Sequence, residues 1–169
     1  MSKVIIMDTS ILCVFLKVTD METCGPDSDK WDYTRVCKKI DDEIRNNSTL
    51  VLPLATLIET GNHIAQANGD RYQLAKSLSE ILFKTAKSEE PWAAFSLQKQ
   101  LWDEEGLLRL GKEWPKLAAQ SISIGDATIK DVAEYYAKAG FDVEILTGDM
   151  GLKSYQPIQK HTLQPRRRR

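Results

Sequence analysis

The sequence predicts an α/β protein with three layers, in which helices cover both faces of a central sheet. Short apolar runs, suited to buried strands, alternate with longer segments that repeat apolar residues every three to four positions. Strands separated by helices favour parallel pairing, because a helix returns the chain to the same end of the sheet. We therefore expect a sheet of about four to five mainly parallel strands. The 169 residues are enough for one domain with a sizeable core.

The first half is expected to contain two strand–helix pairs and a further helix. The apolar run Val4–Met7 ends in Asp8, and Thr9 and Ser10 are suited to cap the helix that follows. Pro53 closes a second apolar run and precedes another helical segment. The expected elements are a strand at 4–7, a helix at 11–16, a loop at 19–30, a helix at 31–45, a strand at 49–52, and helices at 54–68 and 71–88.

The second half is harder to divide, because its middle is long and rich in tryptophan. Pro115 lies inside a helical pattern and is expected to kink or end that helix. Gly140 is suited to the position just after a helix end. The expected elements are a strand at 93–97, a helix at 104–118, a helix beginning at 126, a strand at 143–147, a short edge strand at 158–163 and a tail at 164–169, with 1–163 forming the domain.

Four carboxylates lie where a strand ends or where a helix begins. Asp8 ends the first strand, and Glu59 lies early in the helix after the second strand. Asp126 begins a helix, and Asp149 follows the strand at 143–147. In a right-handed parallel sheet, strand ends and the starts of the next helices share one edge, which is where ligands bind. The four side chains are therefore expected to meet there.

Converging carboxylates repel one another, so a divalent cation is their expected partner. Mg²⁺ or Mn²⁺ prefers carboxylate and water oxygens and leaves positions for phosphate oxygens, which suits phosphodiester hydrolysis. Other roles stay open for three of the acids: Asp126 as a helix cap, Glu59 as a solvent-facing residue and Asp149 as a turn residue. Asp8, in contrast, has no packing reason to follow a buried strand.

The segments that carry these acids resemble the motifs of PIN-domain nucleases. The resembling segments are Asp8-Thr9-Ser10 after the first strand, Leu57-Ile58-Glu59 on the helix after the second strand, Ile124-Gly125-Asp126-Ala127-Thr128-Ile129, and Leu146-Thr147-Gly148-Asp149. Each motif is short, and the resemblance depends on their order and context. It covers nearly the whole chain, from Val4 to about Tyr155.

The resemblance implies a compact α/β/α fold and a magnesium- or manganese-dependent endoribonuclease that cleaves single-stranded RNA. Asp8, Asp126 and Asp149 would hold the metal with Glu59 assisting, and these four would be the catalytic residues. Many small stand-alone members of the family are VapC-type toxins held inactive by an antitoxin, and others process ribosomal or messenger RNA. The implied partners are an RNA substrate, an antitoxin or other protein inhibitor, and a second copy in a homodimer.

Two other functions stay open at this point. A phosphatase of the haloacid dehalogenase type also carries an Asp after its first strand. Such enzymes normally need a second Asp two residues later, where this chain has Ser10. The other alternative is a PIN-like scaffold that binds RNA or protein and has only residual acids.

Composition bears on the kinds of metal site and on the cellular compartment expected for the protein. Three cysteines without C-x-x-C spacing and two histidines disfavour a disulfide framework and a zinc site. No apolar run is long enough to cross a membrane, and no signal-peptide pattern is present, so we expect a cytoplasmic protein. The net charge is −1, and the chain ends in Arg166–Arg169, a basic tail suited to phosphate contacts or simply solvated.

Several polar residues near the acids have other expected roles. Thr9, Ser10 and Thr147 are expected mainly to cap helices and to form hydrogen bonds at strand ends. Asp131 lies about 140° around its helix from Asp126 by ideal helical geometry, so we exclude it from the site.

Overall fold

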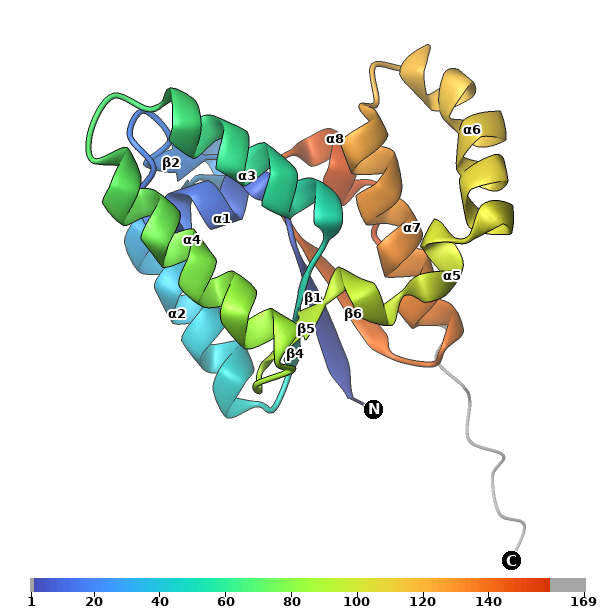
Figure 1. Cartoon of the computed structure of the whole chain (residues 1–169), viewed down its shortest axis with the longest axis horizontal. Coiled ribbons are helices and arrows are strands. Elements are labelled where there is room, and N and C mark those ends of the chain that lie inside the picture. The colour runs from blue at the N-terminus through green and yellow to red at the C-terminus, as the bar shows by residue number, and fades with distance from the viewer. Residues whose placement is uncertain (1, 159–169) are drawn as a thin grey trace, which may run out of the picture.

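Four parallel strands form the centre of the computed structural model, which describes residues 2–158 (Figure 1). In chain order the strands are β1 (Lys3–Met7), β4 (Thr49–Leu52), β5 (Trp92–Ala94) and β6 (Asp142–Leu146). They lie side by side in the order β5-β4-β1-β6. Ile5 in the middle of β1 is paired with Leu50 on one side and Glu144 on the other. The predicted parallel sheet is confirmed, and β1 lies inside it.

Helices cover both faces of this sheet, as predicted (Figure 1). The first face is packed against helices from the first half of the chain: α1 (Thr9–Leu16), α2 (Tyr33–Arg45), α3 (Leu54–Gln66) and α4 (Arg71–Ala86). The second face is packed against later helices: α5 (Lys99–Trp102), α7 (Ile124–Lys138) and α8 (Met150–Lys153). The remaining helix, α6 (Glu104–Ala118), lies outside this layer and packs on α5 and α7.

The side chains of β1 alternate between the two cores, as strand geometry requires. Ile5 and Met7 belong to the core under α1 and α2, whereas Val4 and Ile6 belong to the core under α7. All four are at most 1% exposed. The strand is therefore packed on both faces, and this packing fixes the position of Asp8, which follows it at the carboxyl-end edge of the sheet.

A small antiparallel hairpin begins in the segment expected to be a loop at 19–30 and ends in the first two residues of the helix expected at 31–45. Its strands are β2 (Thr23–Cys24) and β3 (Trp31–Asp32), with a 3₁₀ turn, η1 (Asp27–Asp29), between them. The helix expected from residue 31 begins at Tyr33 instead, because the Asp32 side chain accepts a hydrogen bond from the Arg35 amide at 2.8 Å and caps it. Trp31 is buried in the hairpin.

Two predictions for the tryptophan-rich region were wrong in detail. The third strand is β5, and Phe95–Leu97 form a 3₁₀ turn, η2, rather than its continuation. Pro115 was expected to kink or end α6, and the helix does not end there but continues to Ala118. Pro115 and Gly111 are both exposed, so water can bond the Gly111 carbonyl that proline leaves without an amide partner.

The end of the chain is only partly described. Ile158 is not in a strand, and residues 159–163 of the expected edge strand lie outside the described range, as does the tail at 164–169. Within residues 2–158, no helix combines the length and the apolar character needed to cross a membrane.

Candidate functional site

Asp8 lies at the carboxyl end of β1 and is the N-cap of α1, a role the sequence suggested for Thr9 and Ser10. Its side chain is almost fully enclosed, since the residue is 5% exposed. One oxygen, Oδ2, accepts hydrogen bonds from the Ser10 hydroxyl at 2.6 Å and from the Thr147 hydroxyl at 2.7 Å. A longer bond of 3.4 Å comes from the Ser10 amide. Asp8 is therefore fixed by donors from α1 and from the end of β6.

The two hydroxyls that hold Asp8 are themselves oriented by backbone amides. The Gly148 amide donates to the Ser10 hydroxyl at 3.0 Å, and the Asp149 amide donates to the Thr147 hydroxyl at 2.9 Å. These bonds connect the start of α1 to the turn after β6, which are 138 residues apart for the Gly148–Ser10 pair. The strand-end hydrogen bonds predicted for Thr147 are confirmed, whereas the capping predicted for Thr9 and Ser10 was wrong, because Asp8 is the N-cap of α1.

Gly148 is required at this turn by close packing. A Cβ atom there would lie 2.6 Å from the Cys24 sulfur and 2.8 Å from the Gly25 amide nitrogen, both in the β2–β3 hairpin. The hairpin therefore packs closely against the turn that carries Asp149. Burial raises the pKa of the Cys24 thiol, so Cys24 is in its neutral form where it contacts this turn.

Glu59 is half-buried near the start of α3 and points toward the neighbouring helices, not into solvent. The Thr9 hydroxyl donates to Glu59 Oε2 at 2.9 Å, which ties α3 to the first turn of α1. The other oxygen, Oε1, lies against Gly125, where a Cβ atom would overlap it. The solvent-facing alternative for Glu59 is thus wrong, and Gly125 provides the space that this carboxylate occupies.

Asp126 lies in the first turn of α7, but Ser123 is the N-cap of that helix. The Ser123 hydroxyl accepts a hydrogen bond from the Asp126 amide at 3.0 Å and donates to Asp126 Oδ2 at 2.8 Å. Burial raises the pKa of Asp126, and the charges of Asp8 and Asp149 raise it further. Asp126 is therefore close enough to Asp8 and Asp149 for their negative charges to repel its own.

Asp149 has a definite structural role, because it caps the short helix α8. Its Oδ1 accepts hydrogen bonds from the Gly151 amide at 2.6 Å and the Leu152 amide at 3.1 Å. Unlike Asp8, it is exposed. The alternative that Asp149 is a turn residue is thus partly correct, because its Oδ1 caps α8. Its Oδ2 has no hydrogen-bond partner within residues 2–158.

The four carboxylates share one pattern of bonding. Among the hydrogen bonds of residues 2–158, each has one engaged oxygen and one oxygen with no hydrogen-bond partner. Within the same range, none of the four forms an ion pair with a lysine, arginine or histidine. Within residues 2–158, therefore, no ion pair with a basic side chain compensates the negative charge of this edge.

The four acids lie near the same edge of the sheet, but they do not form a complete metal-binding site. In the part of the chain that is described, no three His, Cys, Asp or Glu side chains are arranged to hold a metal ion. Asp8, Asp126 and Asp149 interact electrostatically, and Glu59 joins them through Thr9 and Gly125. The four acids thus lie near one edge, and their convergence on a shared cation stays a prediction.

Two residues of this edge were missed at the sequence level. Ser123 stands three residues before Asp126, and this Ser-x-x-Asp spacing is a capping signal that identifies it. Gly125 carries no such signal, because its importance depends on Glu59 arriving from another helix. Asp131, excluded by its position around the helix, lies near Lys130 at 3.9 Å instead.

Comparisons of the chain with protein-family models, with curated proteins and with solved structures found no significant match. The function is therefore argued from the site itself.

Proposed function

We propose that this protein is a metal-dependent phosphodiesterase whose site is the acidic edge of the parallel sheet. More specifically, we propose a PIN-like endoribonuclease that cleaves single-stranded RNA. The observation that carries the proposal is the set of four carboxylates at one edge, each with a free oxygen and none with a basic partner within residues 2–158. Uncompensated carboxylates at a ligand-binding edge are suited to divalent cations.

The donor set fits a hard cation. All the free atoms are carboxylate oxygens, which Mg²⁺ and Mn²⁺ prefer, and Asp8, Asp126 and Asp149 would hold the ion with Glu59 assisting. Because no three of them are yet within reach of one ion, binding requires at least one side chain to turn toward the others. Asp149 is the exposed member of the set and the one with most room to do so.

When bound, the metal would neutralise phosphate charge and lower the pKa of a coordinated water. The chain's own contribution is orientation. Ser10 and Thr147 fix one oxygen of Asp8, so that the other oxygen keeps a constant direction. Thr9 does the same for Glu59, and Ser123 for Asp126. The N-termini of α1 and α7 also favour anions at this edge, because helix dipoles are positive there.

The direct test is metal-dependent cleavage of a mixed RNA pool by the full chain. We expect cleavage with Mn²⁺ or Mg²⁺, none with EDTA, and a loss of more than about 100-fold in Asp8→Asn. The matched control is Asp131→Asn, which removes an acid from α7 outside the site and should leave the rate unchanged. Circular dichroism must show that Asp8→Asn is folded, and equal cleavage by this variant and the wild type would contradict the proposal.

A non-catalytic scaffold is the second candidate, favoured by the lack of a formed three-ligand group within residues 2–158. Isothermal titration with Mn²⁺ separates the two: binding that Asp8→Asn removes supports the nuclease, and no binding at millimolar metal supports the scaffold. The phosphatase alternative receives no support, because Ser10 bonds Asp8 where such enzymes need a second acid. An antitoxin-like inhibitor and a homodimer stay predictions of the resemblance.

A further inference from the structure

A cleft lies between α6 and α7. These two helices are on the side of the molecule away from α4 (Figure 1). Its volume is about 710 Å³. Most of its wall comes from one face of α6, and Lys130 is its contribution from α7. The lining residues are Glu105, Leu108, Arg109, Lys112, Glu113, Lys116, Leu117 and Lys130. Cations outnumber acids in this lining.

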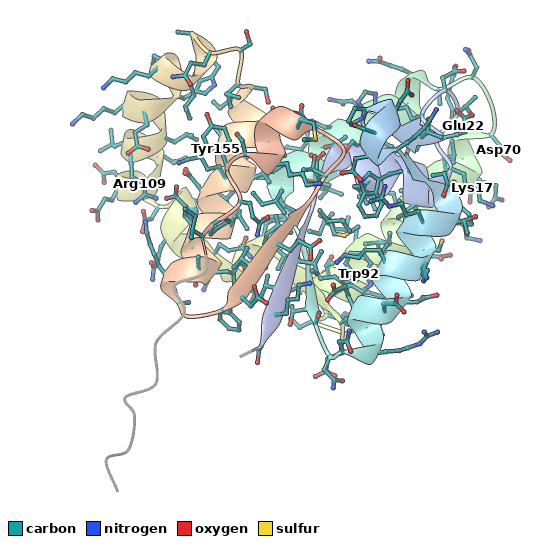
Figure 2. All side chains as sticks on the ribbon, turned by 180° about the vertical axis from the view of Figure 1, so that it is seen from behind. Lys17, Glu22, Asp70, Trp92, Arg109 and Tyr155 are labelled. Carbon is teal, nitrogen blue, oxygen red and sulfur yellow. The ribbon has the colours of Figure 1, made fainter. Side chains whose placement is uncertain are left out.

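Three of the cations form a row along α6. Arg109, Lys112 and Lys116 follow one another at intervals of three and four residues, so they lie on one face of the helix about one turn apart. All three are exposed, and within residues 2–158 none forms an ion pair. Figure 2 shows Arg109 on α6, on the opposite side of the molecule from Asp70 at the start of α4. Lys130, in contrast, is held by Glu134 at 2.8 Å.

The cationic row ends in the last turn of α6, and the next helix, α7, carries Asp126 in its first turn. Helix α6 runs roughly antiparallel to α7 (Figure 1) and is joined to the start of α7 by a five-residue connection, 119–123. Lys116 is therefore on the last turn before the connection that leads to Asp126. Lys130 lies four residues after Asp126, one turn further along the same side of α7. Of the three acids of α6, Glu104 and Glu105 are at the far end of the helix, and Glu113 lies between Lys112 and Lys116 in the lining.

We propose that this cleft binds the backbone of the single-stranded RNA substrate and leads it to the acidic edge. The inference rests on the proposed function, because it assigns the cleft to the substrate of that site. Unpaired lysine and arginine side chains in a row complement successive phosphates and release counterions on binding. Leu108 and Leu117 supply apolar surface between them. Helix-dipole compensation would explain Lys116 near the helix end, but not Arg109 and Lys112 on the same face.

The test is equilibrium binding of a fluorescein-labelled, mixed-sequence single-stranded RNA to the full chain in EDTA, measured by anisotropy over a range of salt. The variant is Lys112→Gln/Lys116→Gln. Two lost phosphate contacts should lower the slope of log Kd against log salt by about 1.4 and weaken binding roughly tenfold or more at 0.1 M salt. The matched control is Lys76→Gln/Lys84→Gln on α4, two exposed lysines on the opposite side of the molecule that form no ion pair within residues 2–158.

Equal binding by the cleft variant and the control variant would overturn the proposal, provided thermal unfolding shows both to be folded. Cleavage assays keep the two proposals separate. If the wild type cleaves RNA, the cleft variant should raise KM and leave kcat unchanged. If the wild type never cleaves but the cleft variant alone loses binding, the nuclease fails and the RNA cleft stands. If Asp8-dependent cleavage occurs and the cleft variant binds normally, the cleft fails and the nuclease stands.

Discussion

Two groups of carboxylates lie at opposite ends of β1 and differ in what surrounds them. At the beginning of the strand, Lys3 bonds both Glu43 and Glu144 at 2.7 Å, and Lys39 bonds the same two acids at 2.7 and 2.9 Å. Ser48 donates a further bond to Glu43 at 2.6 Å. Burial alone would raise the pKa of Glu43, but these donors lower it to about 2. This group is a closed, compensated network.

At the end of the same strand, the acids have hydroxyl and amide donors but no cation within the described range. Asp8 is held by Ser10 and Thr147, and Asp126 by Ser123. Hydrogen bonds fix the direction of these carboxylates without cancelling their charge. The chain thus pairs Glu43 and Glu144 with lysines, whereas the acids at the other end have no basic partner within residues 2–158, which is what the proposed ligand site requires.

The largest expected contrast is in the response to metal. At Mn²⁺ about 100-fold above its Kd, a bound ion should stabilise the folded wild type by about 2.7 kcal/mol. Asp8→Asn should lose this gain, whereas Glu144→Gln should keep it, because Glu144 is already paired with lysines. Thermal unfolding with and without Mn²⁺ measures both. Equal stabilisation of wild type and Asp8→Asn by Mn²⁺ would contradict the claim that the acids at the end of β1 bind metal.

Removing charge should have opposite effects on stability at the two ends of β1. Glu43→Gln should lower the free energy of unfolding by about 2 kcal/mol, since it breaks bonds from two lysines at an enclosed carboxylate. Asp126→Asn should be neutral or slightly stabilising, because it relieves repulsion from Asp8 and Asp149. Urea unfolding at neutral pH compares them directly, and similar losses in both variants would contradict this account.

The same Glu43 network predicts a pH dependence. Its carboxyl pKa falls from 4.5 to about 2 on folding, so the folded state favours the ionised form. The stability it contributes is therefore complete above the unfolded pKa and is lost as the pH falls from about 4.5 to about 2. The difference in unfolding free energy between wild type and Glu43→Gln should shrink over this window. A difference that stays constant to pH 2 would argue against the network.

A smaller effect should come from the hydroxyl that connects Asp8 to the β6–α8 turn. Thr147→Val removes the donor to Asp8 and the acceptor of the Asp149 amide. We expect about a tenfold loss of cleavage and a stability loss of about 1 kcal/mol. Thr147→Ser keeps the hydroxyl and should recover most of the rate. Equal activity in the valine and serine variants would show that the hydroxyl does not position the site.

The smallest effects concern two helical glycines in different surroundings. Gly111→Ala on α6 meets open space and should stabilise the protein by about 0.5–1 kcal/mol, because alanine suits a helix better. At Gly125 the same change should give less stability or none, since the new Cβ must displace Glu59 Oε1. Cleavage should fall only in the Gly125 variant. Unfolding and rate measurements on the pair test whether Glu59 needs this space.

Much of the fold could be predicted because apolar periodicity is local. The run Val4–Met7 alternates between two cores, so it had to be a buried strand, and its carboxyl end had to place Asp8 at an edge. Pro115 does not end α6, because the Gly111 carbonyl that it leaves without an amide partner belongs to an exposed residue that water can reach. The β2–β3 hairpin was missed because each of its strands has only two residues, too few to show alternation.

Local sequence patterns predicted the four strands of the main sheet, the longer helices and the junctions at which the four acids lie, because these follow from residues close together in the chain. Which oxygen of each acid is engaged depends on contacts between distant segments, since Thr147 reaches Asp8 across 139 residues and Thr9 reaches Glu59 across 50. The tertiary structure also decided which acids are compensated. The pairing of Lys3 and Lys39 with Glu43 and Glu144 depends on α2 packing against β1 and β6, and no local pattern specifies that contact.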